Sequence, residues 1–237
     1  MTSVENHELD VFISGELVDL SIPTSDFAEN SNWYSWFNNR DITKFLEQGI
    51  YPNNNVNQLE FFNNISSDRL VLIITDKEER NIGVISLSFI NHSKKSCDIA
   101  LVVSDEGDKR LKPYISLEAM ALMTTHAFDM LAIERVNAGQ HIALAGWQNR
   151  LELLGYQLEG LHTNRFKKGL EVSDSMSIAV CKEDYDAVCK KRHGNLWDSC
   201  TEMKRRIKNF PRQTYLKMLK DIYNNERKKY YDNVFDL

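Results

Sequence analysis

The sequence of 237 residues predicts an α/β (α+β) protein, with a mixed, mostly antiparallel central sheet flanked by helices and a helical C-terminal extension. Three observations predict this class. Runs with the strand period of two occur before, between and after segments with helical spacing. Some neighbouring runs have connections too short for a crossover, which favours antiparallel pairing, whereas others are separated by a helix. The last part of the chain has helical spacing alone.

The N-terminal elements are expected to be one strand and two helices. Alternating apolar residues predict the strand over residues 11–20. Asn32 is suited to cap a helix that carries two tryptophans on one face and ends at Gly49. A polar, asparagine-rich connector follows, and residues 56–65 should form the second helix.

A meander and a long helix are expected in the centre of the chain. Strand patterns cover residues 69–75, 81–90 and 97–104, and the turns between them are short and polar. These three strands should therefore pair in antiparallel fashion. Apolar residues spaced for one buried face predict a helix over residues 114–131, and a strand over residues 135–140 should follow it.

The C-terminal elements are a helix, a hairpin and a helical tail. The helix is expected over residues 143–155, where Gly155 would end it. Residues 156–165 and 172–180 should form the hairpin. Apolar residues at i, i+3, i+4, i+7 and i+8 then predict an amphipathic helix in the tail, and they are Tyr215, Met218, Leu219, Ile222 and Tyr223.

Charge is unevenly distributed along the chain. The net charge of −5 combines −10 over residues 1–181, with 15 basic and 25 acidic side chains, and +5 over residues 182–237, with 14 and 9. An acidic body with a basic tail predicts two units. We therefore expect one catalytic or binding domain at residues 1–181 and a helical, basic C-terminal extension at residues 182–237.

Composition excludes several classes of protein. The 42% hydrophobic and 27% charged content is typical of a soluble globular chain. The sequence contains no apolar run long enough to span a membrane, and its polar start differs from a signal peptide, so the expected location is the cytoplasm. The four cysteines form no C-x-x-C pair and should be reduced thiols. A zinc site at Cys181, Cys189, His193 and Cys200 is conceivable, but the spacing does not favour it, and no metal is expected.

Four stretches of this sequence, in their order and spacing, carry a family resemblance. They are WYSWFNNRDITKFLEQGIYP, NIGVISLSFINHSKKSCDIALVV, ISLEAMALMTTHAFDMLAIERVNAG and LELLGYQLEG. Together they resemble the GNAT (GCN5-related N-acetyltransferase) superfamily, and most of all its bacterial branch that acetylates amino groups of nucleotide-linked sugars and related small molecules. The resemblance covers about residues 11–181. It implies a GNAT fold and the transfer of an acetyl group from acetyl-CoA to an amine.

The resemblance also implies where acetyl-CoA binds. Family members hold it in a cleft between two parallel strands that splay apart, here residues 97–104 and 135–140. The pantetheine arm would pair with the backbone of Leu101, Val102 and Val103, as an added strand does. The pyrophosphate would lie at the N-terminus of the long helix, where free N–H groups and the helix dipole attract anions.

The sequence departs from the family pattern at the phosphate-binding turn. The small residues of that pattern fall on Tyr114 and Ser116, and the turn contains no glycine. The basic side chains of Lys109, Arg110 and Lys112 could bind the phosphates instead, or could form no more than a solvated loop.

A second departure lies in the helix before Gly155. The positions of an asparagine that touches the cofactor and of a tyrosine that protonates the departing thiolate fall on Leu144 and Leu151. After a local shift Asn149 would reach the cofactor, and the alternative is an ordinary surface asparagine. These departures keep a second hypothesis open, a GNAT-fold binding or interaction protein that has lost catalysis.

Asp98 is the candidate catalytic base, because the resemblance implies a carboxylate on the cleft strand and Asp98 interrupts an apolar run there. Its alternative interpretation is a hydrogen-bonded polar residue at a strand edge. The acceptor amine is expected between the first helices and the meander, where the sequence offers aromatic, basic and acidic side chains. These candidates are Trp33, Trp36, Asn39, Arg40, Glu47 and Tyr51.

Partners follow from the same features. We expect a small-molecule amine as substrate and a second copy or another protein bound through the C-terminal helices. Nucleic acid is a third hypothesis, because the tail is basic and contains aromatic residues. The acidic residues interspersed in the tail, and its apolar stripe, favour packing over nucleic-acid binding.

Overall fold

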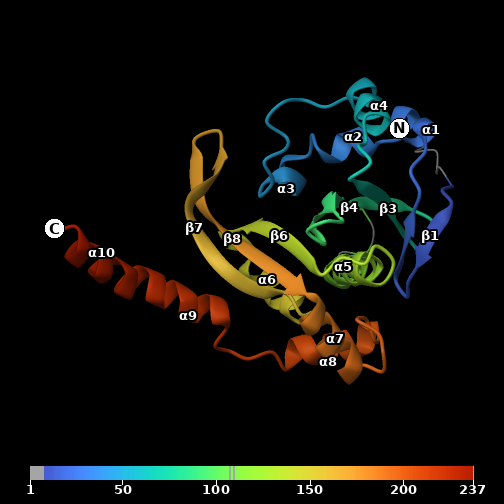
Figure 1. The fold of residues 1–237 in the computed structure, drawn as a ribbon. Helices are drawn as coiled ribbons and strands as arrows, with labels where there is room; N and C mark the ends of the chain where they lie inside the picture. The colour runs from blue at the N-terminus through green and yellow to red at the C-terminus, as the bar shows by residue number, and fades with distance from the viewer. Residues whose placement is uncertain (1–7, 107, 109, 237) are drawn as a thin grey trace.

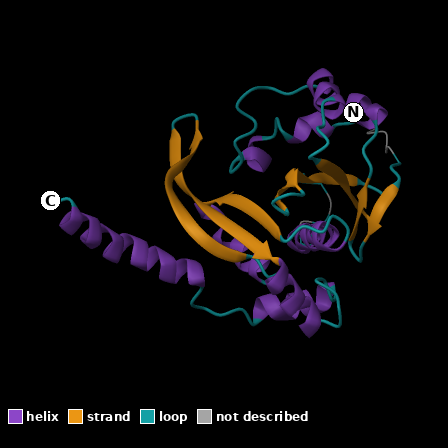
Figure 2. Cartoon of the chain, in the orientation of Figure 1, coloured by secondary structure: helices purple, strands orange, loops and turns teal. Residues whose placement is uncertain are grey.

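The computed structural model describes residues 8–106, 108 and 110–236. Their strands form one eight-stranded sheet in the order β1-β2-β3-β4-β5-β6-β8-β7, with helices around it (Figure 1, Figure 2). The neighbours β5 and β6 are parallel, and the other described neighbours are antiparallel. The predicted mixed, mostly antiparallel class and the helical C-terminus are therefore confirmed.

Most strands lie close to the predicted segments, but the single strand expected over residues 11–20 is two antiparallel strands, which the turn at Gly15 separates. The strands are β1 (Val11–Ser14), β2 (Val18–Ser21), β3 (Leu70–Asp76), β4 (Asn81–Asn91), β5 (Ser96–Val103), β6 (Arg135–His141), β7 (Gln157–Lys168) and β8 (Glu171–Cys181). The helices are α1 (Ser25–Asn30), α2 (Trp33–Trp36), α3 (Arg40–Thr43), α4 (Asn55–Asn63), α5 (Lys112–Asp129), α6 (Ala145–Glu152), α7 (Lys182–Lys191), α8 (Cys200–Lys208), α9 (Tyr215–Ile222) and α10 (Lys228–Val234).

The predicted helix from Asn32 to Gly49 is wrong, because two short helices, α2 and α3, take its place. Asn39 explains the break. Its backbone is extended, and its side-chain oxygen accepts hydrogen bonds from the N–H groups of Asp41 and Ile42, so it caps a new helix instead of continuing the old one. The chain from Lys44 onward is then free to form a loop.

The sheet has two covered faces over β3 and β4. Alternate residues such as Leu72 and Ile85 pack into the main core with α5, which is buried along much of its length. The opposite residues, such as Ile73 and Val84, pack with α1 and α2 in a second, smaller core. Side-chain alternation in strands thus gives each face its own set of helices.

The C-terminal extension has two parts. Tyr185 and Met203, on α7 and α8, are buried in the main core beside the sheet, and the Tyr185 hydroxyl donates to Asp129 on α5 at 2.9 Å. In contrast, α9, a π-helical turn (Tyr223–Arg227) and α10 form an arm that begins against the body and then extends away from it (Figure 1). Leu216 of α9 is buried in the main core, and the Tyr223 hydroxyl donates to the Leu161 carbonyl of β7 at 2.9 Å. Residue 181 therefore marks the end of the sheet, and the packed body continues into α9.

Candidate active site

The parallel strands β5 and β6 part after a short paired segment. Pairing covers Ser96–Asp98 on β5 and Arg135–Asn137 on β6, although β5 continues to Val103 and β6 to His141. Over its remaining length β5 pairs with β4 on its other side. The side of β5 that faces β6 is thus left without a strand partner in the described part of the chain.

Two hydrogen bonds show which β5 residues face the gap. The Lys95 carbonyl accepts from Arg135 N at 3.1 Å, and Ser104 N donates to the Ile82 carbonyl of β4 at 2.8 Å. Because backbone groups alternate along a strand, the odd-numbered Leu101 and Val103 direct their N–H and C=O groups toward β6. Even-numbered residues, including Val102, direct theirs toward β4.

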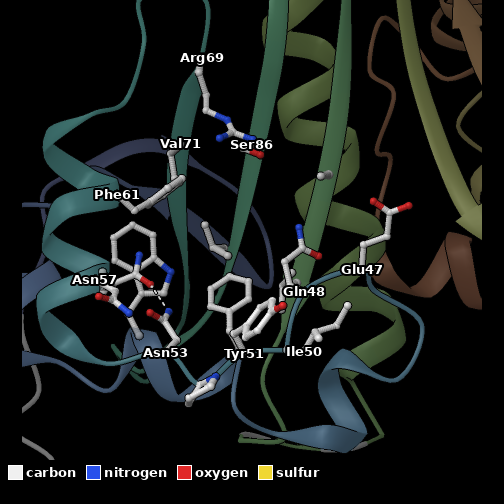
Figure 3. A pocket seen from close by; sticks show the side chains of 18 residues that line it. Glu47, Gln48, Ile50, Tyr51, Asn53, Asn57, Phe61, Arg69, Val71 and Ser86 are labelled. Carbon is white, nitrogen blue, oxygen red and sulfur yellow. Dashed lines mark hydrogen bonds between the residues drawn. The ribbon is translucent and has the colours of Figure 1, made fainter. Parts of the chain in front are cut away.

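A pocket of about 620 Å³ lies against β3, β4 and β5, on the face of the sheet that α2 and α4 cover (Figure 3). Its floor consists of side chains from β3, β4 and β5, and its walls are mainly aromatic and amide side chains. The lining residues are Trp33, Phe37, Glu47, Gln48, Gly49, Ile50, Tyr51, Pro52, Asn53, Asn57, Gln58, Phe61, Arg69, Val71, Val84, Ser86, Ala100 and Val102.

The loop that closes one side of the pocket, residues 47–53, is held at both ends. The Asn38 carboxamide accepts from Asn53 N at 2.7 Å and donates to the Asn53 carbonyl at 2.8 Å. At the other end, Lys168 from the β7–β8 hairpin donates to the Gln48 carbonyl at 2.6 Å. Elements distant in sequence therefore set the shape of the pocket.

The chain matches no protein-family model, and no curated protein sequence is significantly similar to it. Solved structures are similar in fold. A GCN5-related N-acetyltransferase from Brucella melitensis superposes with a TM-score of 0.63 and 17% identity over 83% of this chain and 88% of that one. Mutant forms of the spermidine/spermine N-acetyltransferase SpeG from Vibrio cholerae superpose with a TM-score of 0.62 and 12% identity over 73% and 98%.

The chain has the GNAT fold. The expected fold is therefore confirmed, and the parallel pair β5 and β6 occupies the place of the expected splayed strands. At these identities the similarity extends to the fold alone. The roles of individual residues must be argued from the geometry of this chain.

Three of the six predicted acceptor residues line the pocket, namely Trp33, Glu47 and Tyr51. The other three do not, and each has a physical reason. Trp36 is buried in the second core, and Asn39 is occupied as the cap of α3. Arg40 is exposed outside the pocket.

Asp98 lies where β5 and β6 part. Its Oδ1 accepts a hydrogen bond of 3.1 Å from the Nδ2 of Asn137, its neighbour across the parallel ladder. Asn137 is itself fixed, because its Oδ1 accepts from Arg135 Nε at 2.7 Å. Asp98 is half-buried and shares its face of β5 with the pocket residues Ala100 and Val102. The carboxylate therefore lies where the strands part, on the pocket's face of the sheet but outside the pocket lining.

The loop before α5 has its basic residues paired. Arg110 forms an ion pair with Asp108 at 3.0 Å, and Lys112 with Asp105 at 2.9 Å. The third predicted side chain, Lys109, lies outside the described residues. The helix α5 already begins at Lys112, with no side-chain cap from the described part of the chain.

Tyr114 and Ser116 consequently lie within the first turns of α5. The Tyr114 ring is in contact with Lys204 of α8, whose Nζ lies 5.2 Å from the ring centroid. Ser116 donates from its hydroxyl to the carbonyl of Lys112 at 2.9 Å. The start of α5 therefore differs from a glycine turn, and α8 of the extension lies beside it.

The predicted departures in α6 have distinct surroundings. Leu144 is the N-cap position of the helix, and Leu151 is buried in the main core. Asn149 is half-buried, and its Oδ1 is buried without a hydrogen-bond partner among the described residues. Asn149 thus has an acceptor atom free for a ligand.

Sequence reasoning missed Arg69, which lines the pocket from the residue before β3. Its signal was a lone arginine directly before the apolar run of that strand. The pattern alone would place such a residue at an exposed strand end. Only the packing of α4 over β3 puts it inside the pocket.

Metal and membrane features are absent from the described residues. No group of three His, Cys, Asp or Glu side chains among them could hold a metal ion. The described cysteines are free thiols, and burial raises the pKa of Cys97 to about 12. Within the described ranges, no helix combines the length and apolar character that crossing a bilayer requires.

Proposed function

We propose that the protein is an N-acetyltransferase that moves the acetyl group of acetyl-CoA to an amine of a small molecule. One observation carries the proposal. The gap beside β5 and the pocket floor share that strand, so a donor paired with its free backbone edge would lie next to an acceptor resting on Ala100 and Val102. Such proximity supplies much of the rate enhancement in a group transfer.

The donor side fits the pantetheine arm better than the pyrophosphate. Leu101 and Val103 offer unpaired N–H and C=O groups to an extended chain. At α5 the N–H groups of Lys112 and Tyr114 already donate to the carbonyls of Asp108 and Leu111, and Pro113 has none to offer. Arg110 must share its charge with Asp108.

Acetyl-CoA, when bound, supplies an activated thioester. The chain must then orient the amine, accept its proton and polarise the carbonyl. Asp98 accepts the proton directly or through one water, while Asn137 holds its carboxylate in place. Of the N–H groups of Leu101 and Val103, the one that the pantetheine arm leaves unused polarises the carbonyl. Since Leu151 has no proton to give, water is left to protonate the departing thiolate.

The proposed acceptor is an amino sugar, and more specifically an amino sugar linked to a nucleotide. Tyr51 and Phe61 are exposed aromatic residues of the pocket lining, and aromatic faces stack on sugars and bases. Trp33 is buried and packs against Phe61. Asn53 and Asn57 add amide groups that suit hydroxyls. The pocket also has room for a ligand of this class.

A GNAT-fold binding protein without catalysis is the second candidate. It is favoured by the ion-paired loop before α5 and by Leu151 in place of a proton donor. Calorimetry with acetyl-CoA, together with thiol release in the presence of amino sugars, separates the two. We expect micromolar binding and amine-dependent thiol release. Absence of binding at millimolar acetyl-CoA would contradict the enzyme, and binding without release would support the second candidate.

We also propose that the arm of α9 and α10 binds a second copy of the chain or another protein. Apolar side chains exposed along it support this, and they are Tyr215, Met218, Ile222, Tyr230, Tyr231, Val234 and Phe235. Light scattering should give a mass above 27.5 kDa for the full chain. A monomer that instead binds RNA or DNA in a salt-sensitive way would favour the nucleic-acid hypothesis.

A further inference from the structure

Arg69 brings a positive charge into the pocket. Its side chain lines the pocket together with Val71 and extends toward Ser86 (Figure 3). The guanidinium carbon lies 5.6 Å from the centroid of the Phe61 ring. Its Nε is buried and has no hydrogen-bond partner in the described part of the chain.

A structural role leaves this arrangement unexplained. Buried polar atoms in folded proteins almost always have partners. Stacking against Phe61 holds the guanidinium in position but satisfies none of its N–H donors. Among the described residues, no carboxylate forms an ion pair with Arg69. The partner of this guanidinium is therefore expected from outside the described chain.

The other polar groups of the pocket agree with an anionic partner. Ser86, toward which Arg69 extends, adds a hydroxyl. Trp33 also lines the pocket, and its Nε1 is a buried donor without a described partner. Glu47 is the one acidic residue among the described lining residues, and it is exposed. The proposed base Asp98 lies outside the lining, so a polyamine would bring its cations toward Arg69 with only Glu47 beside them in the described lining.

We propose that the acceptor carries an acidic group, a carboxylate or a phosphate, which binds to Arg69 while its amine lies over β5. The inference rests on the proposed N-acetyltransferase function and specifies its substrate class. Arg69 precedes β3, two strand spacings or about 10 Å from β5. The amine and the acidic group therefore belong to one small molecule that spans the pocket floor.

Calorimetry on the full-length protein tests this with three sugars that share one amino-sugar ring. Glucosamine lacks an acidic group, glucosamine 6-phosphate adds a phosphate, and muramic acid adds a carboxylate. At least one acidic sugar should bind about 10- to 100-fold more tightly than glucosamine, as expected for one charge-assisted, hydrogen-bonded pair. The sugar whose affinity exceeds that of glucosamine shows whether the acidic group is a phosphate or a carboxylate.

Substitutions test whether Arg69 causes this gain in affinity of the acidic sugars over glucosamine. Arg69→Gln should remove it, so that the acidic sugars bind this variant no more tightly than glucosamine does, and Arg69→Lys should keep part of it. Arg165→Gln, at an exposed arginine of β7, is the matched control and should keep all of it. If Arg69→Gln fails to fold by circular dichroism, Arg69→Lys decides, and it must then reduce the gain by about threefold or more.

The inference is overturned by equal binding of the three sugars, or by a gain that survives Arg69→Gln. Because the measurement is binding and not turnover, the two proposals can fail separately. Arg69-dependent binding without acetyl transfer would support the acidic acceptor and contradict the enzyme. Transfer to glucosamine 6-phosphate or muramic acid that is insensitive to Arg69→Gln would support the enzyme and contradict the role of Arg69 in binding an acidic acceptor.

Discussion

The Nζ of Lys168 lies 2.6 Å from the backbone carbonyl oxygen of Gln48, and this contact joins the β7–β8 hairpin to the loop that rims the pocket. The same ammonium donates to the carbonyls of Thr43 at 2.6 Å and Leu46 at 3.2 Å. All three donors of one lysine are therefore used to hold a single loop.

Loss of this contact should loosen the pocket without disturbing the donor side. Lys168→Met keeps the length of the side chain but leaves three carbonyls without their donor, so we expect the KM for the acceptor to rise about tenfold as the loop loses its set position. Affinity for acetyl-CoA should stay within about twofold. Steady-state kinetics with both substrates measure whether the KM for the acceptor changes while that for acetyl-CoA does not.

Lys167→Met is the matched control, because Lys167 is an exposed neighbour on the same strand with no described contact to the loop. It should leave both constants unchanged. Equal effects of the two substitutions on the acceptor KM would show that the three carbonyl contacts do not shape the pocket.

Asp98 is predicted to act in proton transfer. Asp98→Asn can still accept the hydrogen bond from Asn137, so the fold and acetyl-CoA binding should be preserved. Removal of a general base should lower kcat by about 100-fold. Asp186→Asn, at an exposed residue of α7, is the control and should keep the wild-type kcat. A wild-type kcat in Asp98→Asn would assign Asp98 to structure alone.

The β5–β6 gap illustrates what the sequence predicts well. The strand patterns at 97–104 and 135–140 were enough to place the two strands, because period-two alternation is a local property. The register was not predictable. Pairing stops after Asp98 and Asn137, and that depends on packing between elements distant along the chain.

Arg69 and Asn39 show why most of the candidate pocket escaped prediction. Arg69 enters the pocket through the packing of α4 on β3, for which no residue pattern gives a signal. The sequence predicts that Asn39 contacts the acceptor, yet its side chain caps α3, and the following segment forms the pocket loop. The conformation in which such a side chain caps a new helix and the one in which it continues the preceding helix differ little in local energy. Tertiary contacts therefore decide between the two conformations.

Glu118 on α5 should stabilise the turn between β1 and β2. Its buried carboxylate accepts from the N–H groups of Glu16, Leu17 at 2.6 Å and Val18 at 3.2 Å. Glu118→Ala leaves these donors unpaired and should lower the free energy of unfolding by about 2–4 kcal/mol. Urea unfolding measures the loss. A loss below about 0.5 kcal/mol would mean that water replaces the carboxylate.

Glu118 should also make stability depend on pH. Burial raises its pKa above the ordinary value of 4.5, so the native state holds the proton more tightly than the unfolded state. The stabilisation from protonation is complete below 4.5 and is lost as the pH rises through the native pKa. Wild type should therefore gain stability relative to Glu118→Gln between pH 7 and pH 5. A relative loss over that interval would indicate a lowered pKa.

The extension should divide at α8 when the chain is truncated. Tyr185, Cys189, Leu196 and Met203 are buried in the main core, and each contributes about 1.5–3 kcal/mol. That sum is comparable to the whole stability of a domain, so a chain ending at residue 181 should not fold. A chain ending at residue 222 keeps these contacts and should melt cooperatively, within about 5 °C of wild type. Circular dichroism melts compare the three chains. Cooperative melting of the 1–181 chain would show instead that the sheet and α5 suffice, and that α7 and α8 are an addition to a complete domain.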